Sequence, residues 1–299
     1  MAARWLDLVD PAKDELLRAL PPGVDPDVVE VLLAPASDGV RVRPLLESHG
    51  GYVFGIFLEA VPEQEQDRIT YREIDVVASP DLVVTVRKTP TGSTAWISAP
   101  VEASSPGESA GALLHRLIDD VAESFLSAVG AVDEEIDELE EHMEDWSPER
   151  VRGRVSGLRQ DLLHARRNVS ATRAAIRRIV DHRLDVSDDR LFPTDVEQLF
   201  VDTYETLVRA GDELDVARDL LASARDHHQA KVAESQNEIV KTLTVIASLV
   251  LVPTLIVGYY GQNFEGAFDD WHWSLAFSTS LIVVTTVVQL VAYRWRRWI

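Results

Sequence analysis

The sequence contains no cysteine. Disulfide bridges, thiolate catalysis and cysteine-ligated zinc sites are therefore excluded. The sequence also lacks a glycine-rich phosphate-binding loop, a nucleophile-elbow motif and a histidine-rich metal cluster. Its many carboxylates lie on expected helices without a paired base. These absences argue against an enzyme, and no residue pattern calls for a bound cofactor.

Basic residues are scarce. The 299 residues include 29 lysines and arginines against 50 aspartates and glutamates, a net charge of −21. Residues 241–299 hold four basic and three acidic residues, so the other 240 residues hold 25 basic and 47 acidic ones and carry −22. A nucleic-acid partner is disfavoured because phosphate binding requires a basic face. The acidic body suits an interaction with cations, or simply solubility.

Two long segments near the C-terminal end contain no charged residue. They are Thr242–Tyr260 and Ser274–Tyr293, of 19 and 20 residues. A helix needs roughly 20 apolar residues to cross the hydrocarbon core of a bilayer. Both segments are therefore predicted to span a membrane. The first ten residues have no apolar core of the kind found in signal peptides, so we expect no cleaved signal.

Basic residues flank the two predicted spans on one side only. Lys241 precedes the first span, and Arg294, Arg296 and Arg297 follow the second, whereas residues 261–273 contain neither lysine nor arginine. The positive-inside rule then places both termini in the cytoplasm and the short loop outside the cell membrane. One pair of spans cannot enclose a pore, so any transport function requires an oligomer.

The first hundred residues read as mixed α/β. We expect strands at Gly51–Glu59, Ile74–Val77 and Leu82–Arg87, and helices at Pro11–Leu20 and Asp25–Leu33. Long helices are then expected over Ser109–Asp145, from Pro148 to about Asp185 with Ser147 as cap, and from about Asp195 into the membrane. The expected organisation is a cytoplasmic α/β domain (1–108), long antiparallel helices (109–194), a stalk helix continuing into the first span (195–260), an outer loop (261–273), a second span (274–293) and a basic tail (294–299).

The last of these helices carries a heptad repeat. Leu207, Leu214 and Leu221 recur every seven residues, with Ala210, Ala217 and Ala224 in the paired position. This pattern predicts a coiled-coil seam that lets several helices approach closely, and so an oligomer. Small residues also help any membrane helices to pack, which is the plainer alternative. In the membrane the same frame selects Asn237, Val240, Thr244, Ala247, Leu251, Thr254, Gly258 and Gly261.

Two charged segments invite other interpretations. The acidic run Asp133–Asp145 could concentrate cations, but such a run is more often a solvated helix face. The basic stretch Arg150–Arg183 is expected to form an antiparallel partner helix with complementary charge. The pair His227-His228 points in two directions on a helix and cannot chelate one ion unaided.

With these features in place, the chain resembles the CorA metal-ion transporter superfamily. The resemblance rests on Tyr260-Gly261-Gln262-Asn263-Phe264 directly after the first span, where that family carries Y-G-M-N-F. It rests also on Asn237-Glu238 and Lys241 before that span, on Pro253 within it, and on the basic, tryptophan-containing tail Arg294–Ile299.

The resemblance implies a homopentamer with a funnel-shaped cytoplasmic part, in which the first span of each subunit lines the pore. Gly261, Gln262 and Asn263 would form the entrance ring, whose amide oxygens suit a hydrated Mg²⁺ because this ion dehydrates reluctantly. Leu243 and Val240 would form a hydrophobic constriction. The pore-lining residues implied are Asn237, Val240, Leu243, Thr244, Ala247, Leu251, Thr254 and Gly258.

The family also implies a cytoplasmic metal sensor between neighbouring subunits. Asp202 matches the acid on the stalk helix, since it stands 35 residues before Asn237. Its expected partner on the next subunit falls near Glu30, although the family's acid aligns with Val31. Bound Mg²⁺ would then lock the closed ring by screening the repulsion among the acidic bodies.

Because of departures from the family pattern, the sequence does not specify which metal ion is transported. Gln262 replaces the usual methionine, and the loop lacks the common M-P-E-L run, although Glu265, Asp269 and Asp270 could attract cations. The first hypothesis is Mg²⁺ uptake, with Co²⁺ or Ni²⁺ as further cargo. The second is a ZntB-like Zn²⁺ transporter, with proton coupling as one form of it. A third, from another class, is a membrane-anchored coiled-coil scaffold that conducts nothing.

Overall fold

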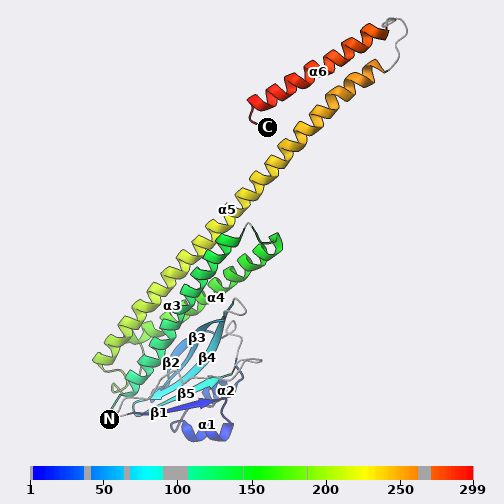
Figure 1. The fold of residues 1–299 in the computed structure, drawn as a ribbon. Helices are drawn as coiled ribbons and strands as arrows, with labels where there is room; N and C mark the ends of the chain where they lie inside the picture. The colour runs from blue at the N-terminus through cyan, green and yellow to red at the C-terminus, as the bar shows by residue number, and fades with distance from the viewer. Residues whose placement is uncertain are drawn as a thin grey trace. The chain divides into compact units, whose positions relative to one another are not determined.

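The computed structural model describes residues 3–36, 42–63, 68–89, 107–143, 145–186, 188–261 and 271–298, with backbone only for 271–274. The chain divides into two units, residues 1–225 and 226–299, which we describe one at a time (Figure 1). Several predictions concern residues outside the described ones: the loop at Ser104, and the roles of Gln262, Asn263, Glu265, Asp269 and Asp270.

The first unit contains a five-stranded sheet in the order β1-β5-β4-β3-β2. The central strands β4 and β5 contain the predicted segments Ile74–Val77 and Leu82–Arg87, and β3 overlaps the predicted Gly51–Glu59 but begins only at Val53. The two edge strands were not predicted: β1 pairs in parallel with β5, and β2 pairs antiparallel with β3. The bounds are β1 Arg4–Val9, β2 Leu45–Ser48, β3 Val53–Glu63, β4 Arg68–Ser79 and β5 Leu82–Lys88.

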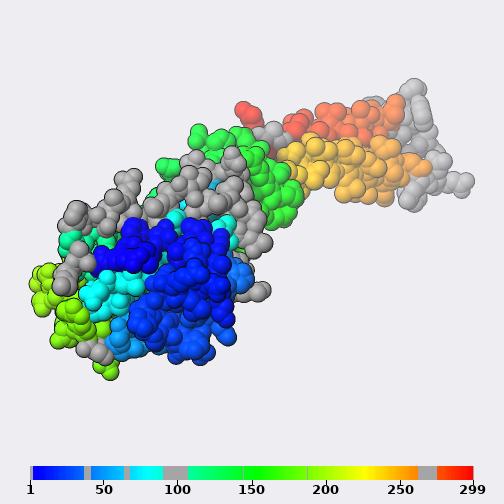
Figure 2. All heavy atoms as spheres, turned by 90° about the horizontal axis from the view of Figure 1, so that it is seen from below, coloured from blue at the N-terminus to red at the C-terminus, as the bar shows by residue number. Residues whose placement is uncertain are grey.

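Helices cover both faces of this sheet, and apolar side chains of β3 point into the core on each face. Phe54 and Ile56 pack with α1 (Lys13–Ala19) and α2 (Pro26–Leu33), whereas Val53 and Phe57 belong to the larger core under the long helices. The blue N-terminal segment forms much of the surface on the α1/α2 side (Figure 2). Asp25 caps α2, its side chain accepting a hydrogen bond from the backbone of Asp27 at 3.0 Å.

Three long helices follow: α3 (Ala110–His142), α4 (Pro148–Val180) and α5 (Thr194–Tyr260). Ser109 and Ser147 cap the first two through backbone amides three residues ahead, as expected for serine before an apolar run. The start of α3 packs closely on the segment before α5, since a Cβ added at Gly111 would lie 2.0 Å from the Leu191 carbonyl oxygen. Only glycine fits there.

The heptad seam of α5 has a different partner from the one predicted. All six of its leucines and alanines are at most 4% exposed within a single chain, in one core with residues of α3 and α4. They therefore cannot face a second copy. Leucine and alanine at heptad spacing bury one stripe of a helix, and here that stripe is buried by the two neighbouring helices of the same chain. The residues concerned are Leu207, Ala210, Leu214, Ala217, Leu221 and Ala224.

The second unit consists of the rest of α5 and of α6 (Trp271–Trp295). Among the described residues, α5 and the stretch Leu275–Trp295 are long and apolar enough to cross a membrane. Both helices expose large aliphatic side chains, such as Leu255 at 70% and Val291 at 63%. Lipid rather than water is the natural surrounding for such surfaces.

Candidate functional site

One face of α5 in the second unit packs against α6. Its members recur at helical spacing and are at least partly buried, with Val245 only 6% exposed. Ser248 Oγ lies 2.6 Å from the hydroxyl of Tyr293, and Gln289 donates to the Ser248 carbonyl oxygen at 3.4 Å. Polar contacts of this kind hold helices together in a bilayer, where water offers no alternative partner. The face comprises Lys241, Val245, Ser248, Leu249, Val252, Pro253, Ile256 and Tyr260.

The residues predicted to line a pore lie on the other side of the same helix. At 100° per residue their mean direction is roughly 150° from that of the α6-facing residues. All are exposed in the single chain, Val240 by 59%, Leu243 by 60% and Leu251 by 67%. Packing within the chain therefore leaves this face uncovered. Its other members are Asn237, Thr244, Ala247, Thr254, Gly258 and, at the helix end, Gly261.

The two threonines on this face are arranged as oxygen acceptors. Thr244 donates its hydroxyl hydrogen to the Val240 carbonyl oxygen and Thr254 donates to that of Val250, each at 2.7 Å. The hydrogen is thereby used within the helix, and the oxygen lone pairs remain available on the exposed side. Such oxygens can receive hydrogen bonds from the water shell of a cation without adding a charge.

Gly261 is the last described residue of the entrance motif. Its amide donates to the Val257 carbonyl oxygen at 2.8 Å, so it continues the last turn of α5 and is exposed. Gln262 and Asn263 follow directly in the sequence. The position of Gly261 at the end of the span agrees with an entrance location, but the ring itself stays a prediction.

Asp202, the predicted sensor residue, is exposed on α5 and lies in an acidic neighbourhood. The adjacent Thr203 hydroxyl is 2.8 Å from an Asp119 carboxylate oxygen and 3.0 Å from His115 Nε2. Burial lowers the pKa of His115, while Asp119 and Asp202 act in the opposite direction. Burial, followed by the nearby Asp119, raises the pKa of Asp120, against the effect of Arg116.

The α3 residues beside Asp202 were missed by the sequence reasoning. A His115–Asp119 pair at spacing i, i+4 was the available signal. Its relation to Asp202 depends on how α3 and α5 pack, which no local pattern specifies. Among the described residues, no group of three or more histidine, aspartate or glutamate side chains has a geometry able to hold a metal ion.

Glu30, the predicted partner of Asp202, is exposed on α2, on the sheet face opposite the long helices. One chain therefore does not bring the two acids together, and only a neighbouring subunit could supply the second. Next to Glu30, the Val31 carbonyl oxygen accepts a hydrogen bond from Lys88 Nζ at 2.8 Å.

Lys88 belongs to a buried charged cluster that was also not predicted. Its ammonium group lies 2.6 Å from Glu73 and 2.7 Å from Asp75, and all three side chains are at most 3% exposed. Burial, followed by the charge of Glu73, raises the pKa of Asp75 to about 7, against the effect of Lys88. The cluster joins β4 and β5 to α2 through the Val31 carbonyl.

Comparison with known sequences shows that this chain is similar to metal-ion transporters. A family described as "CorA-like Mg2+ transporter protein" matches residues 2–297. A putative metal ion transporter, YfjQ of Bacillus subtilis, is 24% identical over 82% of this chain and 75% of its own length. The cobalt/magnesium transport protein CorA of Thermotoga maritima is 25% identical over 62% of this chain, and the match spans about half (52%) of that relative.

Solved structures show the same fold. The complete CorA magnesium transporter from Methanocaldococcus jannaschii superposes with a TM-score of 0.78 over 99% of this chain and 91% of its own, at 18% identity. The ZntB cytoplasmic domain from Vibrio parahaemolyticus superposes with a TM-score of 0.59 over 78% of this chain and 89% of its own, at 14% identity. At such identities the likeness concerns architecture alone.

Proposed function

The chain belongs to the family of CorA-like Mg2+ transporter proteins, and from this premise we propose that it forms a homopentamer that admits divalent cations, Mg²⁺ first, into the cell. The family is one of cation transporters and not of enzymes. Both termini are proposed to lie in the cytoplasm, and Co²⁺ or Ni²⁺ are proposed as further cargo.

The division of α5 into two faces is the observation that carries this proposal. One face contacts α6, and the opposite face is exposed over the whole span while holding no ionisable residue. Lipid does not require glycine, alanine and threonine in register, whereas helices that meet around a path do. Five copies arranged with this face inward would enclose a conduit lined by small and hydroxylated side chains.

The chemistry of such a conduit suits a hydrated cation. Mg²⁺ gives up its inner water shell reluctantly and can therefore be bound with that shell intact. Amide and hydroxyl oxygens that accept hydrogen bonds from the shell waters are sufficient for this. Gly261, Gln262 and Asn263 would meet the ion, with Glu265, Asp269 and Asp270 raising its local concentration. Val240 and Leu243 would form the narrow apolar segment that closes the path by dewetting.

The regulatory site is proposed to involve Asp202 of one subunit and the region of Glu30 on the next. Asp119, which lies 2.8 Å from the hydroxyl of the adjacent Thr203, adds to the negative potential there. Bound Mg²⁺ would offset the repulsion between acidic bodies and favour the closed ring, and loss of Mg²⁺ would release it.

Mg²⁺ uptake into proteoliposomes under an inside-negative potential tests the path. We expect Asn263→Ala to abolish most uptake and Thr254→Leu to reduce it at least tenfold, because leucine removes an acceptor oxygen and narrows the conduit. Thr279→Leu is the matched control, since Thr279 is exposed on α6 and makes the same backbone bond within its helix. Uptake unchanged in both path variants would refute the assigned path, and a wild-type protein without uptake would favour the scaffold.

Zinc transport is the second candidate, because Gln262 departs from the methionine that the family carries there and a ZntB cytoplasmic domain shares this fold. Fluxes of Mg²⁺, Co²⁺ and Zn²⁺ measured on the purified protein, with and without a proton gradient, separate the two. Passive Mg²⁺ flux supports the first candidate. Zn²⁺ flux that follows the pH gradient would replace it with the second.

A further inference from the structure

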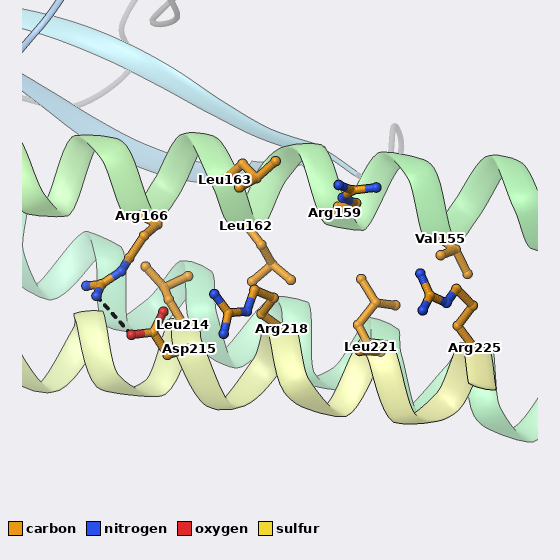
Figure 3. Close-up of a pocket in the computed structure, with 11 residues that line it drawn as sticks. Val155, Arg159, Leu162, Leu163, Arg166, Leu214, Asp215, Arg218, Leu221 and Arg225 are labelled. Carbon is orange, nitrogen blue, oxygen red and sulfur yellow. Dashed lines mark ion pairs between the residues drawn. The ribbon is translucent and has the colours of Figure 1, made fainter. Parts of the chain in front are cut away.

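Ion pairs of this chain differ in how far water reaches them. Arg166 of α4 and Asp215 of α5 lie 2.9 Å apart with side chains 37% and 39% exposed (Figure 3). Such a pair is screened by solvent and contributes little to stability. Lys88 is different, because its ammonium group and the carboxylates of Glu73 and Asp75 are at most 3% exposed. Burying three ionisable groups costs free energy, so this cluster calls for a role other than stability.

Helix α2 is held by a polar side chain at each of its ends. At its start, the hydroxyl of Tyr52 accepts a hydrogen bond from the amide of Asp25 at 3.0 Å. In its last turn, the carbonyl oxygen of Val31 accepts one from Lys88 at 2.8 Å and another from the amide of Ala34 at 3.1 Å. The orientation of α2 on the sheet therefore depends on two polar contacts as well as on its buried apolar side chains.

The contact at the last turn is electrostatically favourable, because the carbonyl end of a helix carries partial negative charge. The last turn of α2 itself contains no basic residue, so Lys88 supplies the cation from β5. Glu73 lies opposite Lys88 in the ladder between β4 and β5, and its carboxylate is 2.6 Å from the ammonium group. The register of the sheet thus places a positive charge at the end of α2.

Asp75 is the least well satisfied member of the cluster. One of its carboxylate oxygens lies 2.7 Å from Lys88, but neither oxygen has a hydrogen bond of good geometry among the described residues. Its neighbours in the ladders are the apolar Ile56 and Val86. Burial, followed by the charge of Glu73, raises the pKa of Asp75 to about 7, against the effect of Lys88.

Ionisation of Asp75 should loosen the cover over the cluster. A carboxylate is more easily ionised in water than in this apolar site, so rising pH favours any local opening that admits water. The last turn of α2 is the contact that such an opening would break. The other ionisable side chains of α1 and α2 are all exposed and do not replace it; they are Lys13, Asp14, Glu15, Arg18, Asp27 and Glu30.

We propose that the buried cluster of Glu73, Asp75 and Lys88 is a tether that fixes the last turn of α2 and thereby positions Glu30 for the cation that it shares with Asp202 of a neighbouring subunit. Lys88 is a positioning residue in this arrangement, since it acts through the backbone next to Glu30. The inference rests on the proposed regulatory site and names the contact that keeps one half of that site in place.

Hydrogen exchange of backbone amides, measured by mass spectrometry on the full-length protein in detergent, tests the tether. Lys88→Met combined with Glu73→Gln and Asp75→Asn removes the ammonium group and leaves none of the three positions charged. We expect exchange over Leu32–Ala34 to become at least tenfold faster, with exchange in α3 and α4 unchanged. Lys13→Met, at an exposed position of α1, is the matched control. Unaltered exchange over Leu32–Ala34 in the triple variant would refute the tether.

The pH profile distinguishes the tether from an ordinary packing contact. In the wild type, exchange over Leu32–Ala34, corrected for the intrinsic chemical rate, should rise at least tenfold from pH 5 to pH 8, because Asp75 ionises in this range. Asp75→Asn should abolish the rise, since an amide does not ionise. Tyr52→Phe, which loosens the other end of α2, should keep the rise. A flat wild-type profile would contradict the part assigned to the cluster.

A titration with Mg²⁺ tests the positioning of Glu30. In the wild type, Mg²⁺ should slow exchange around Asp202 in a saturable manner, and the midpoint should move at least fivefold to higher Mg²⁺ in the triple variant. An unchanged midpoint despite faster exchange in α2 would overturn the positioning role. A wild type in which Mg²⁺ has no effect around Asp202 would refute the regulatory site itself, whereas the tether is decided by the exchange of α2 alone.

Discussion

Two carboxylates, Glu73 and Asp75, share one ammonium group inside the α/β domain. Asp75 is fully buried, and its pKa of about 7 lies well above the ordinary value of 3.8 that holds in the unfolded chain. A raised carboxyl pKa stabilises the fold below the unfolded value, and this contribution is lost as pH rises from about 4 through 7. The pKa of Lys88 is raised by the same carboxylates, which outweigh its burial, so its contribution is lost only above pH 10.5.

Asp75→Asn should remove this loss, because an amide cannot ionise. The stability of the variant relative to the wild type should therefore increase from pH 5 to pH 8, by about 2–4 kcal/mol if most of the shift is expressed. Thermal unfolding of the purified chain at several pH values measures the difference. Asp81→Asn, at an exposed position outside the buried cluster, is the control for the loss of a carboxylate as such. Parallel curves for Asp75→Asn and wild type would contradict the assignment.

Single residues illustrate what could be predicted locally. The cap Ser147 could be predicted because its side chain acts on an amide only three positions away. The buried cluster was not readable, since Glu73 meets Lys88 only through the register of β4 against β5. Asp119 near Asp202 was missed for the same reason, as 83 positions of sequence separate them.

Helices and strands also divide into those that the local sequence predicts and those that depend on distant parts of the chain. The long helices can be predicted from the helical periodicity of their apolar residues, and both spans from an uninterrupted apolar run. The edge strands β1 and β2 are short and half-buried, and β1 is held by parallel pairing with β5, 78 positions further along the chain. The heptad on α5 was recognised, but its partner was assigned to other copies because a repeat specifies which stripe is buried and not by what.

Leu214→Ala tests where that stripe is buried. Leu214 is 2% exposed within one chain, so truncation should cost about 2–5 kcal/mol of unfolding free energy through lost burial and a cavity. Leu220→Ala, at a position 48% exposed, is the control and should cost under about 1 kcal/mol. Denaturant unfolding of the monomer, dissociated by dilution in detergent, provides the measurement. If Leu214→Ala changed only the oligomer mass, the seam would face another copy after all.

At the scale of the whole molecule, the sequence predicts the membrane spans and the charge distribution but not how the parts assemble. Hydropathy identifies the spans, and the acidic body disfavours a nucleic-acid partner. The candidate ion path could be predicted as a face of α5, since its register is a matter of spacing. That this face is left uncovered could be known only from the packing of α6 against α5.

Orientation in the membrane is the last consequence of the charge pattern. Lys241 and the arginines of the tail flank the spans on one side, and retaining several cations on the cytoplasmic side favours a single topology. We expect Glu265→Cys, between the spans, to react with a membrane-impermeant maleimide in intact cells. Ser156→Cys, exposed on α4, should react only after permeabilisation, and the cysteine-free parent supplies a blank background. Because inward cation flow requires the entrance motif to face outward, the reverse labelling pattern would contradict both the topology and the proposed direction of uptake.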